Sequence, residues 1–448
     1  MAFKDMRDFL NHLEDNGRLV RIREEVALEY ELAAYLRKAS DMGDKGPALL
    51  FERVKGHDIP VAGGLYANRQ LMLEALETSE QEANARYLNA IDNLQEHKLL
   101  DRGPCNEVIR LGDEADLTAL PFPTYCELDG GPFITLGIAI SKDPEDGGKN
   151  ASIYRHQVLG KRRLGVLSPP PHHLGVHYRK AEALGKPLEL AIALGVAPSA
   201  LVATQWEAGY GVDELTLAGA FLGEPLEVVK CRTVDLEVPA TAEIIIEGKM
   251  PPGVRAHEGP FGEYTGYYTR ASDKPVMEVS AITHRRDPIL LAGMSGVPTT
   301  DNHVLKMIPM EASCYAMLKR KFAGIKRVHF HGAGGVGLMC IVAMKQYARN
   351  EARQVLATLL GSQGSKLAVV VDEDIDIHDM DKVMWAICTR AQAQKDVMIL
   401  PNMTLWQLDP SAPDDGSYSV MGIDATRPFG KDFEQVALVP DVDKVPDF

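Results

Sequence analysis

The amino-acid sequence predicts a mixed α/β protein built in three parts. Short apolar runs alternate with helix-spaced apolar residues near both ends of the chain, and strand-like runs predominate between them. We therefore expect an α/β unit over residues 1–105, a split, β-barrel-like domain over 106–303, and a C-terminal α/β domain with a tail over 304–448. A chain of 448 residues is long enough for roughly two or three domains.

The first hundred residues carry the signals of a small α/β unit. Apolar residues spaced along one helical face predict a helix over residues 3–16, and Gly17 closes it. The other expected elements are strands at 19–22 and 48–51, a helix at 29–40 and a longer, more polar helix at 73–100.

From Arg110 to Leu291, β-prone runs predominate. The clearest are 134–140, 152–159, 227–231, 242–247 and 276–283. Only one or two helices are expected among them, notably over 176–184, and a proline-rich loop at 117–124 leads into this section. The pattern predicts a barrel-like or strongly curved sheet.

After Asp301 the pattern changes to alternating helices and strands. Helices are expected near 304–321, 347–360 and 379–390, and strands at 327–330, 339–344 and 366–371. Such alternation predicts a compact α/β unit with largely parallel strands. The tail from Asp409 has little periodicity and is expected to be a loop.

Composition and charge argue against several classes of protein. A net charge of −15 leaves no excess of lysine and arginine for binding nucleic acid. The N-terminus is charged from Lys4 onward, which disfavours a secretory leader. The longest apolar run, 188–203, is short and interrupted by Glu189, Gly195 and Pro198, which disfavours a membrane span. Six cysteines lie far apart without a paired motif, which indicates reduced thiols and a cytoplasmic protein.

Two motifs resemble ligand sites but lack the required geometry. Residues 332–337 match the glycine pattern of dinucleotide-binding loops, yet a strand rather than a helix is expected after them, so we interpret them as a turn between strands. Residues 372–376 begin like a calcium loop, but Ile377 and Val383 occupy positions that need glycine and glutamate. An acidic turn with helix-capping carboxylates is the simpler interpretation.

The most informative segments are Glu258–Glu263 and Asn150–Arg155. Two carboxylates flank a Gly-Pro-Phe-Gly sequence, which favours a shaped loop because proline lacks a donor and glycine favours turns. If the segments meet, Arg155 lies between two acids and suits gripping a carboxylate while a neighbouring carboxyl group handles a proton. A solvated turn for the acids and a structural ion pair for Arg155 are the alternatives.

A second candidate constellation contains oxygen and nitrogen ligands. Asn150, His173 and Glu214 form a set suited to Mn²⁺ or Mg²⁺ if the fold brings them together, with phosphate oxygens completing the shell. His172 and His173 follow three prolines that present them rigidly. A histidine pair after prolines is otherwise a loop feature, so the spacing alone leaves both interpretations open.

Together with further motifs in the same order, these segments make the chain resemble the UbiD family of reversible decarboxylases, which use prenylated flavin mononucleotide (FMN). The resemblance covers essentially the full length. The motifs that carry it are Gly46–Phe51, Asn150–Arg155, Val228–Cys231, Val238–Glu243, Glu258–Glu263, Asp372–Asp376 and Gly422–Thr426.

The resemblance implies a flavin-binding central domain with sites for two metals. The implied ligands of Mn²⁺, which bridges to the cofactor phosphate, are Asn150, His173 and Glu214. The implied site for a monovalent cation, expected to be K⁺, consists of Ala203, Thr204, Trp206 and the shared Glu214. Contacts with prenylated FMN are implied for Asn150, Ser152, Ile153, Tyr154, Arg155, His172 and His173.

The implied reaction is the reversible decarboxylation of an aromatic or heteroaromatic acid. Arg155 holds the substrate carboxylate, Glu258 orients Arg155, and the substrate forms a covalent adduct with the modified flavin; CO₂ then leaves and Glu263 donates the proton. This last role requires Glu263 in a dry pocket with a raised pKa. A flavin-independent, metal-dependent decarboxylase or hydrolase, and a non-catalytic subunit of a decarboxylase complex, are the alternatives.

The resemblance also implies partners and a substrate wall. A flavin prenyltransferase is the implied supplier of the cofactor, and the C-terminal domain is the implied oligomerisation domain of a homodimer or an assembly of dimers. Residues 290–298 are expected to form the wall of the substrate pocket that sets specificity. They are mostly small and apolar and include no second arginine, which favours a flat monocarboxylic acid. Val420 departs from the family pattern, because many relatives carry a lysine there near the cofactor phosphate.

Overall fold

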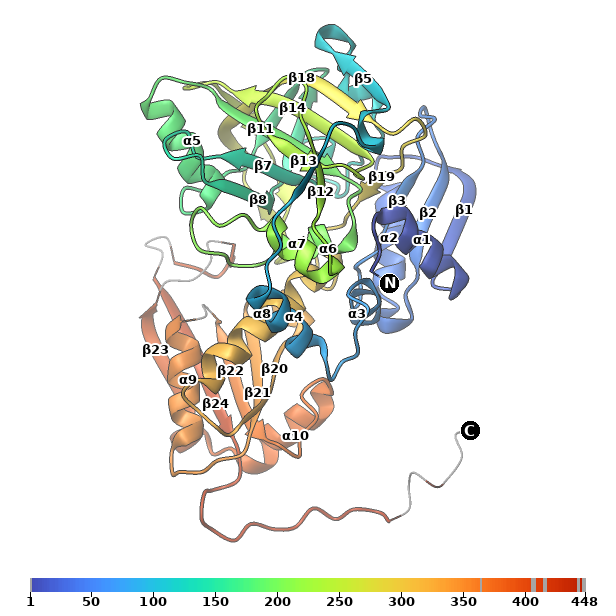
Figure 1. Ribbon diagram of the computed structural model, residues 1–448. Coiled ribbons are helices and arrows are strands. Elements are labelled where there is room, and N and C mark those ends of the chain that lie inside the picture. Colours follow the sequence, from blue (N-terminus) through green and yellow to red (C-terminus); the bar gives the residue numbers. More distant parts are fainter. Residues whose placement is uncertain (1, 363–364, 404–407, 414–416, 441–443, 445–448) are drawn as a thin grey trace. The chain divides into compact units, whose positions relative to one another are not determined.

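The computed structural model describes residues 2–362, 365–403, 408–413, 417–440 and 444 (Figure 1). The chain divides into two compact units. The first unit comprises Met1–Ser313, Phe330–Gly337 and Trp406–Ser411, and the second comprises Cys314–His329, Leu338–Leu405 and Ala412–Phe448. The predicted domain boundaries at 105/106 and 303/304 stay a prediction.

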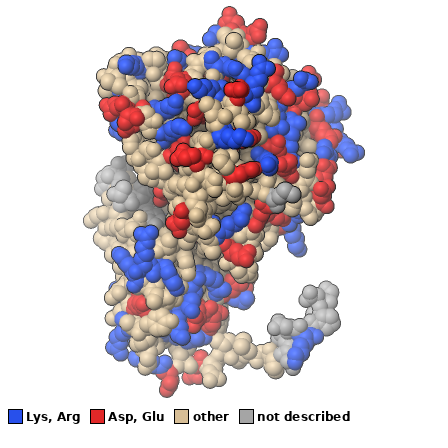
Figure 2. Space-filling view, in the orientation of Figure 1, with Lys and Arg blue, Asp and Glu red and all other residues tan. Residues whose placement is uncertain are grey.

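The predicted mixed α/β class is confirmed. The described residues form sheets of four, ten, three, two and five strands, and none of these sheets closes into a barrel. Acidic and basic side chains are interspersed on the face shown in Figure 2. None of the helices in the described part of the chain combines the length and apolar character that crossing a membrane requires.

The first sheet has the order β1-β2-β3-β19. Its strands are β1 (Leu19–Val26), β2 (Ala48–Val54), β3 (Val61–Gly63) and β19 (Leu290–Ala292). Strands β1 and β2 are parallel, as are β3 and β19, whereas β2 and β3 are antiparallel. Two predicted helices are confirmed here, α1 (Met6–Asp15) and α2 (Glu31–Ser40). Asp5 begins α1 by accepting a hydrogen bond from the Asp8 backbone amide.

The single helix predicted over residues 73–100 is wrong. The segment forms two helices, α3 (Arg69–Ala75) and α4 (Ala83–Asp92), followed by strand β4 (Lys98–Leu100). Glu77 has a φ of 48°, a left-handed conformation that ends a helix. Strand β4 pairs in parallel with β12 (Glu227–Lys230), which pairs antiparallel with β13 (Glu237–Pro239).

The ten-stranded sheet is the core of the first unit. Its main path runs through β6 (Phe133–Ile134), β9 (His156–Gly160), β10 (Arg163–Val166), β18 (Ser272–His284), β14 (Ile244–Met250), β11 (Leu188–Leu194), β7 (Ile138–Lys142) and β8 (Lys149–Ile153). Strands β5 (Val108–Leu111) and β15 (Arg255–Glu258) also pair with β18. The inward residues, such as Ile192 and Ile246, are fully buried.

Two predicted central strands each divide into two. The predicted strand 134–140 becomes β6 and β7, and the predicted strand 152–159 becomes β8 and β9. The second break places Tyr154 and Arg155 in the connection between β8 and β9. Three helices accompany this sheet rather than one or two: α5 (His173–Ala183), α6 (Pro198–Ala203) and α7 (Leu215–Leu222).

The second unit is built on a five-stranded sheet with the order β20-β21-β22-β24-β23. Its elements are β20 (Ile325–Phe330), β21 (Met339–Met344), α9 (Glu351–Ser362), β22 (Leu367–Asp372), α10 (Met380–Arg390), α11 (Ala393–Asp396), β23 (Val397–Met403) and β24 (Tyr418–Ala425). Strands β21, β22 and β24 are parallel and β23 is antiparallel. Helix α8 (Asp301–Lys319) precedes these elements along the chain.

The prediction that the tail from Asp409 is loop is wrong for β24. This strand lies between β22 and β23, and its residues Tyr418 and Val420 are buried. At Gly422 an added Cβ would lie 3.1 Å from Leu356 and Leu360 of α9, so glycine permits this close approach. A glycine and an aspartate within the strand hide its period of two from sequence analysis.

Both sequence motifs that we rejected as ligand sites form turns. Residues 332–334 form a short 3₁₀ turn that leads to strand β21 rather than to a helix. In the acidic segment, Asp372 and Asp374 accept hydrogen bonds from Arg390. Asp379 caps α10 by accepting from the backbone amides of Asp381 and Lys382.

A buried carboxylate joins the N-terminal segment to the central sheet. Glu243 is fully buried and accepts hydrogen bonds from Arg7 Nε at 2.7 Å and Arg7 Nη2 at 2.8 Å. It also accepts from the Ile289 backbone amide at 3.0 Å and lies 3.4 Å from Arg285 Nε.

Replacing Glu243 with glutamine is expected to destabilise the protein by about 3 kcal/mol, because the buried Arg285 guanidinium then loses a charged partner. Thermal unfolding followed by circular dichroism measures the change. The control is Glu224→Gln, since Glu224 pairs with Lys4 on the exposed surface. Equal melting temperatures for the two variants would contradict the prediction.

Candidate active site

The structure brings Arg155 together with Glu258 and Glu263. Arg155 Nε and Nη2 donate to the two carboxylate oxygens of Glu258, each at 2.9 Å. Arg155 Nη1 contacts the Glu263 carboxylate and donates to Thr269 Oγ1 at 2.9 Å. One guanidinium is therefore held by two carboxylates and a hydroxyl.

The two acids are positioned by strands rather than by a free loop. Glu258 is the last residue of β15, where it lies opposite Ser272 of β18. The chain then enters the short strand β16 (Phe261–Gly262), which pairs with β17 (Tyr268–Thr269). The Glu263 backbone amide donates to the Tyr267 carbonyl at 2.9 Å, which fixes the residue at the end of this hairpin.

A glycine on a neighbouring strand makes room for Glu258. Gly165 belongs to β10, and a Cβ at this position would lie 3.0 Å from Glu258 Cγ. Glycine therefore allows the Glu258 side chain to lie across the sheet and reach Arg155.

The group is shielded from water. The side chains of Arg155, Glu258 and Glu263 are 7%, 0% and 9% exposed. The Arg155 guanidinium carbon lies 4.9 Å from the centre of the Phe261 ring, which covers one of its faces. This burial contradicts the alternative that the acids lie on a solvated turn.

Burial sets the protonation of Glu263. Loss of solvation raises the pKa of Glu263, and the like charge of Glu258 adds to this effect, whereas Arg155 and Lys306 oppose it. Glu258 already binds Arg155 through both oxygens, so Glu263 is the acid that can exchange its arginine contact for a proton. The geometry suits one orienting carboxylate and one carboxyl group that transfers a proton.

The candidate metal ligands come from three different elements. Asn150 lies on β8, His173 begins α5, and Glu214 precedes α7. His173 Nδ1 lies 3.7 Å from Glu214 Oε1, and Glu214 Oε2 accepts from the Ala151 backbone amide at 2.7 Å. This last bond places the Glu214 carboxylate beside the residue that follows Asn150.

Burial acts on the protonation of both titratable groups. It lowers the pKa of His173, which favours the neutral ring that binds metals. It raises the pKa of Glu214 to about 7, so this carboxylate needs a positive partner to stay ionised at neutral pH. Asn150 is buried, and its side-chain nitrogen has no hydrogen-bond partner among the described residues. Among the described residues, no group of three or more His, Cys, Asp or Glu side chains could hold a metal ion. The candidate metal site therefore depends on the Asn150 amide as one of its ligands.

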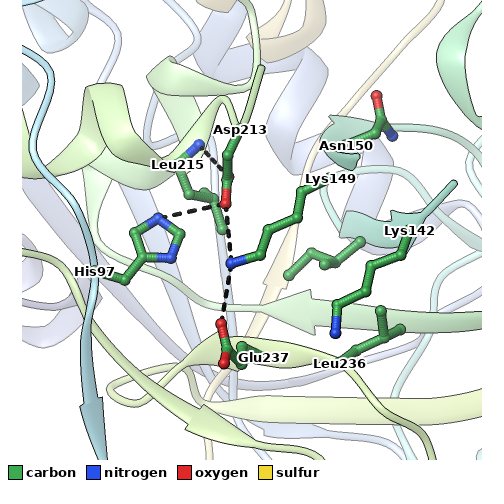
Figure 3. Close-up of a pocket in the computed structure, with 9 residues that line it drawn as sticks. His97, Lys142, Lys149, Asn150, Asp213, Leu215, Leu236 and Glu237 are labelled. Atoms are coloured by element: carbon green, nitrogen blue, oxygen red, sulfur yellow. Dashed lines mark hydrogen bonds and ion pairs between the residues drawn. The ribbon is translucent and has the colours of Figure 1, made fainter. Parts of the chain in front are cut away.

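A cluster of charged side chains lies beside Asn150 and joins the chain segments around the candidate metal ligands (Figure 3). Lys149 Nζ lies 3.4 Å from Asp213 and 3.0 Å from Glu237, and His97 lies 3.7 Å from Asp213. The Asn150 side chain points away from the cluster. Because Lys149 and Asp213 immediately precede Asn150 and Glu214, their ion pair ties together the backbone segments that carry two candidate ligands. Sequence analysis missed this cluster, because its members are far apart in the chain.

The predicted K⁺ residues surround the end of α6. Ala203 is the last residue of the helix, and its carbonyl accepts from the Trp206 backbone amide at 3.1 Å. Thr204 Oγ1 donates to the Leu201 carbonyl at 2.6 Å. A helix C-terminus carries partial negative charge, which favours a cation. Helix α6 packs against α7, the helix that follows Glu214.

The predicted flavin contacts lie along β8 and the start of α5. Ser152 and Ile153 are half-buried on β8, and Tyr154 is buried with its hydroxyl 3.4 Å from the Leu174 backbone amide. The His172 ring stands edge-on to Tyr154, with ring centres 6.2 Å apart. Val420 lies in the second unit, buried opposite Leu400 in the sheet.

Two further residues, Thr269 and Lys306, act on the acid group and were not assigned a role from the sequence. Thr269 binds Arg155, as described above. His303 Nε2 contacts the Tyr264 carbonyl, and Lys306 lies over the Tyr264 ring. These residues were missed because their nearness to the Glu263 segment arises only in the folded protein, and no local sequence motif indicates it.

Family comparisons match almost the whole chain. Residues 98–298 match the Rift-related domain of 3-octaprenyl-4-hydroxybenzoate carboxy-lyase, the UbiD family. Residues 10–91 match the N-terminal domain of this family and residues 303–425 its C-terminal domain.

Individual proteins are similar over their full length. The chain is 34% identical to a phenolic acid decarboxylase of Bacillus subtilis, covering 96% of this chain and 93% of the relative. The structure of the UbiD-class enzyme HmfF from Pelotomaculum thermopropionicum in complex with FMN matches with a TM-score of 0.92 and 41% identity, over 99% of both chains. An evolved dimeric form of that enzyme in complex with prenylated FMN matches with a TM-score of 0.90 and 39% identity, again over 99% of both chains.

Replacing Glu258 with glutamine is expected to lower the pKa of Glu263. The substitution removes a like charge and leaves Glu263 as the only carboxylate on Arg155, and both effects favour ionised Glu263. Infrared titration of the carboxyl stretch, assigned by its loss in the Glu258→Gln/Glu263→Gln double variant, measures the midpoint. A midpoint that stays the same or rises would show that the two acids do not compete for Arg155.

Proposed function

Because the chain belongs to the UbiD family of carboxy-lyases, we propose that it reversibly decarboxylates an aromatic or heteroaromatic carboxylic acid with prenylated FMN as cofactor. The observation that carries this proposal is the buried Arg155 held between Glu258 and Glu263. It supplies a cation for a carboxylate and an acid for a proton in one dry site. The full-length similarity to a phenolic acid decarboxylase supports the substrate class.

The residues present fit the cofactor and its metals. The Asn150 amide oxygen, the neutral His173 ring and the Glu214 carboxylate are the groups that would hold Mn²⁺. Tyr154 and His172, together with Ser152 and Ile153, would contact the flavin. Ala203, Thr204 and Trp206 would complete a K⁺ site with Glu214. When bound, prenylated FMN supplies the electron sink for cleavage of the carbon–carbon bond.

Arg155 binds and orients the substrate carboxylate. Its guanidinium is planar and donates in a fixed fork, so the bound carboxylate takes a defined direction. Glu258 engages Nε and Nη2 and prevents the guanidinium from rotating. The Phe261 ring excludes water from one face of the guanidinium, which strengthens both interactions.

Glu263 handles the proton that replaces CO₂. Only the protonated carboxyl group can donate, and the raised pKa keeps Glu263 protonated at a higher pH than a free glutamate. The donor is therefore present at low pH and lost as the pH rises through the raised pKa. In the reverse direction, the ionised carboxylate accepts the proton from the same carbon.

The proposed partners follow from this chemistry. A flavin prenyltransferase supplies the cofactor, and the small acid and CO₂ are the remaining ligands. We assign oligomerisation, as a homodimer or an assembly of dimers, to the C-terminal α/β domain, and we place the protein in the cytoplasm. A dimeric form is known for the evolved HmfF relative.

The test is a cofactor and substrate assay. The protein is co-expressed with a flavin prenyltransferase, supplied with Mn²⁺, and analysed by absorbance and by the mass of the released cofactor. Bound prenylated FMN and CO₂ release from a panel of aromatic acids are expected. Protein that remains flavin-free yet active would favour a metal-only decarboxylase, and flavin-free, inactive protein would favour a non-catalytic subunit.

Glu263→Gln is expected to reduce CO₂ release about 10²- to 10⁴-fold, because the amide cannot donate a carboxyl proton. The flavin content, measured by absorbance, is expected to stay at the wild-type level. Glu127→Gln serves as the control, because Glu127 is exposed. A rate equal to that of the control would remove Glu263 from the mechanism.

Glu214→Gln is expected to weaken Mn²⁺ binding at least about tenfold, because a neutral amide replaces the only carboxylate of the ligand set. Electron paramagnetic resonance of free Mn²⁺ during titration measures the affinity. Glu224→Gln, on the exposed surface, is the control and should bind Mn²⁺ like the wild type. An unchanged affinity in Glu214→Gln would place the metal elsewhere.

A further inference from the structure

Tyr210 lies in the loop that connects the candidate K⁺ residues to Glu214. This loop, residues 204–213, leaves the end of α6 and leads to α7. Tyr210 is 43% exposed, yet its ring contacts α5, the helix that His173 begins. The loop therefore carries a side chain that packs against a candidate Mn²⁺ ligand on another element.

Three side chains of α5 surround the Tyr210 ring. The His173 ring stands edge-on to it, with ring centres 5.2 Å apart and an interplanar angle of 84°. The His177 ring is also edge-on, with ring centres 5.7 Å apart, and Lys180 Nζ lies 5.2 Å from the centre of the Tyr210 ring. Because residues three and four positions apart lie on one face of a helix, the Tyr210 ring covers the face of α5 that contains His173.

A buried carboxylate fixes the other end of Tyr210. The side chain of Asp143, which follows β7, is fully buried and accepts hydrogen bonds from the Tyr210 hydroxyl and, at 2.6 Å, from Lys180 Nζ. The Asp143 backbone amide donates to the Gly148 carbonyl at 2.7 Å. The loop also approaches this turn closely, since a Cβ at Gly148 would lie 3.1 Å from Gly211 Cα. Tyr210 is therefore anchored to the turn between β7 and β8 while its ring lies against α5.

His173 needs support to act as a metal ligand, because its side chain is 25% exposed. A histidine binds a metal only when a ring nitrogen points at the ion, and neighbouring groups usually fix that orientation. His173 Nδ1 lies 3.7 Å from Glu214 Oε1, a distance that exceeds a hydrogen bond. Packing against the Tyr210 ring is therefore a contact that limits rotation of the imidazole.

We propose that Tyr210 is a positioning residue for the metal site, because its anchored ring holds the His173 imidazole in the orientation that binds Mn²⁺. This inference rests on the proposed function, from which it takes Mn²⁺ and the ligand set. Tyr210 does not itself bind the metal and acts through His173. Asp143 acts one step further out, by fixing the Tyr210 hydroxyl.

The experiment compares Mn²⁺ binding among variants of Tyr210. FMN-loaded protein is titrated with Mn²⁺, and free Mn²⁺ is followed by electron paramagnetic resonance. Tyr210→Leu, which removes the ring, is expected to weaken binding about 10- to 100-fold, as is typical of residues that orient metal ligands. Tyr210→Phe keeps the ring but loses the bond to Asp143, so its affinity is expected to lie between those of the wild type and Tyr210→Leu. Tyr347→Leu is the control and should bind like the wild type, because Tyr347 is 58% exposed in the second unit.

A double-mutant cycle distinguishes positioning from a general loosening of the loop. His173→Gln keeps an oxygen ligand but has no ring to orient, so adding Tyr210→Leu to it is expected to weaken binding by less than about twofold. Equal losses from Tyr210→Leu in the two backgrounds, or a wild-type affinity in Tyr210→Leu alone, would overturn the proposal. Where His173→Gln binds too weakly to titrate, the spin echo of bound Mn²⁺ gives the answer. Its modulation by the imidazole nitrogen is expected to be lost in Tyr210→Leu, and an unchanged modulation would overturn the proposal.

The outcomes also separate this inference from the proposed function. Mn²⁺ binding that depends on Glu214 but not on Tyr210 would overturn the inference and leave the proposed metal ligands in place. Equal binding by the wild type and Glu214→Gln would remove the metal site and, with it, the role of Tyr210. If Mn²⁺ binding depends on Tyr210 but the prenylated-FMN enzyme releases no CO₂ from any acid, the proposed reaction fails while the inference stands.

Discussion

The site depends on one guanidinium shared by two carboxylates inside the protein. Arg155 compensates Glu258 completely and Glu263 only in part, because Glu258 takes two hydrogen bonds and Glu263 shares its nitrogen with Thr269. Burial favours a proton on Glu263, and the like charge of Glu258 adds to this effect, whereas Arg155 and Lys306 oppose it.

The long strand β18 and its neighbouring strands fix the positions of the charged side chains in the site. Strand β15 delivers Glu258 from one side, while β10 contributes Gly165, whose missing side chain leaves space for that carboxylate. Arg155 comes from the break between β8 and β9, where the chain leaves regular pairing and can direct a long side chain inward. Rigid strands thus hold the acids, and an irregular connection holds the guanidinium cation that joins them.

Sequence analysis located the elements with strong periodicity and the acid–arginine motif. Helices α1 and α10 and strand β21 follow the apolar pattern closely, and the Arg155 group was visible as two unusual segments. It missed β24, whose alternation is hidden by glycine and aspartate, and it joined α3 to α4 because the left-handed Glu77 leaves no mark in composition. Lys306 was missed for a different reason: an ordinary lysine on a helix becomes informative only when its surroundings are known.

Because Glu263 contacts Arg155, the protein's own carboxylate competes with any carboxylate that binds Arg155 from solution. The fold holds the Glu263 carboxylate against the arginine at a high effective concentration, so a weakly binding anion from solution displaces it poorly. Taking up a proton neutralises the tethered carboxylate and frees the arginine for an incoming one. In the proposed mechanism, protonation of Glu263 and release of Arg155 for the substrate carboxylate are then a single event.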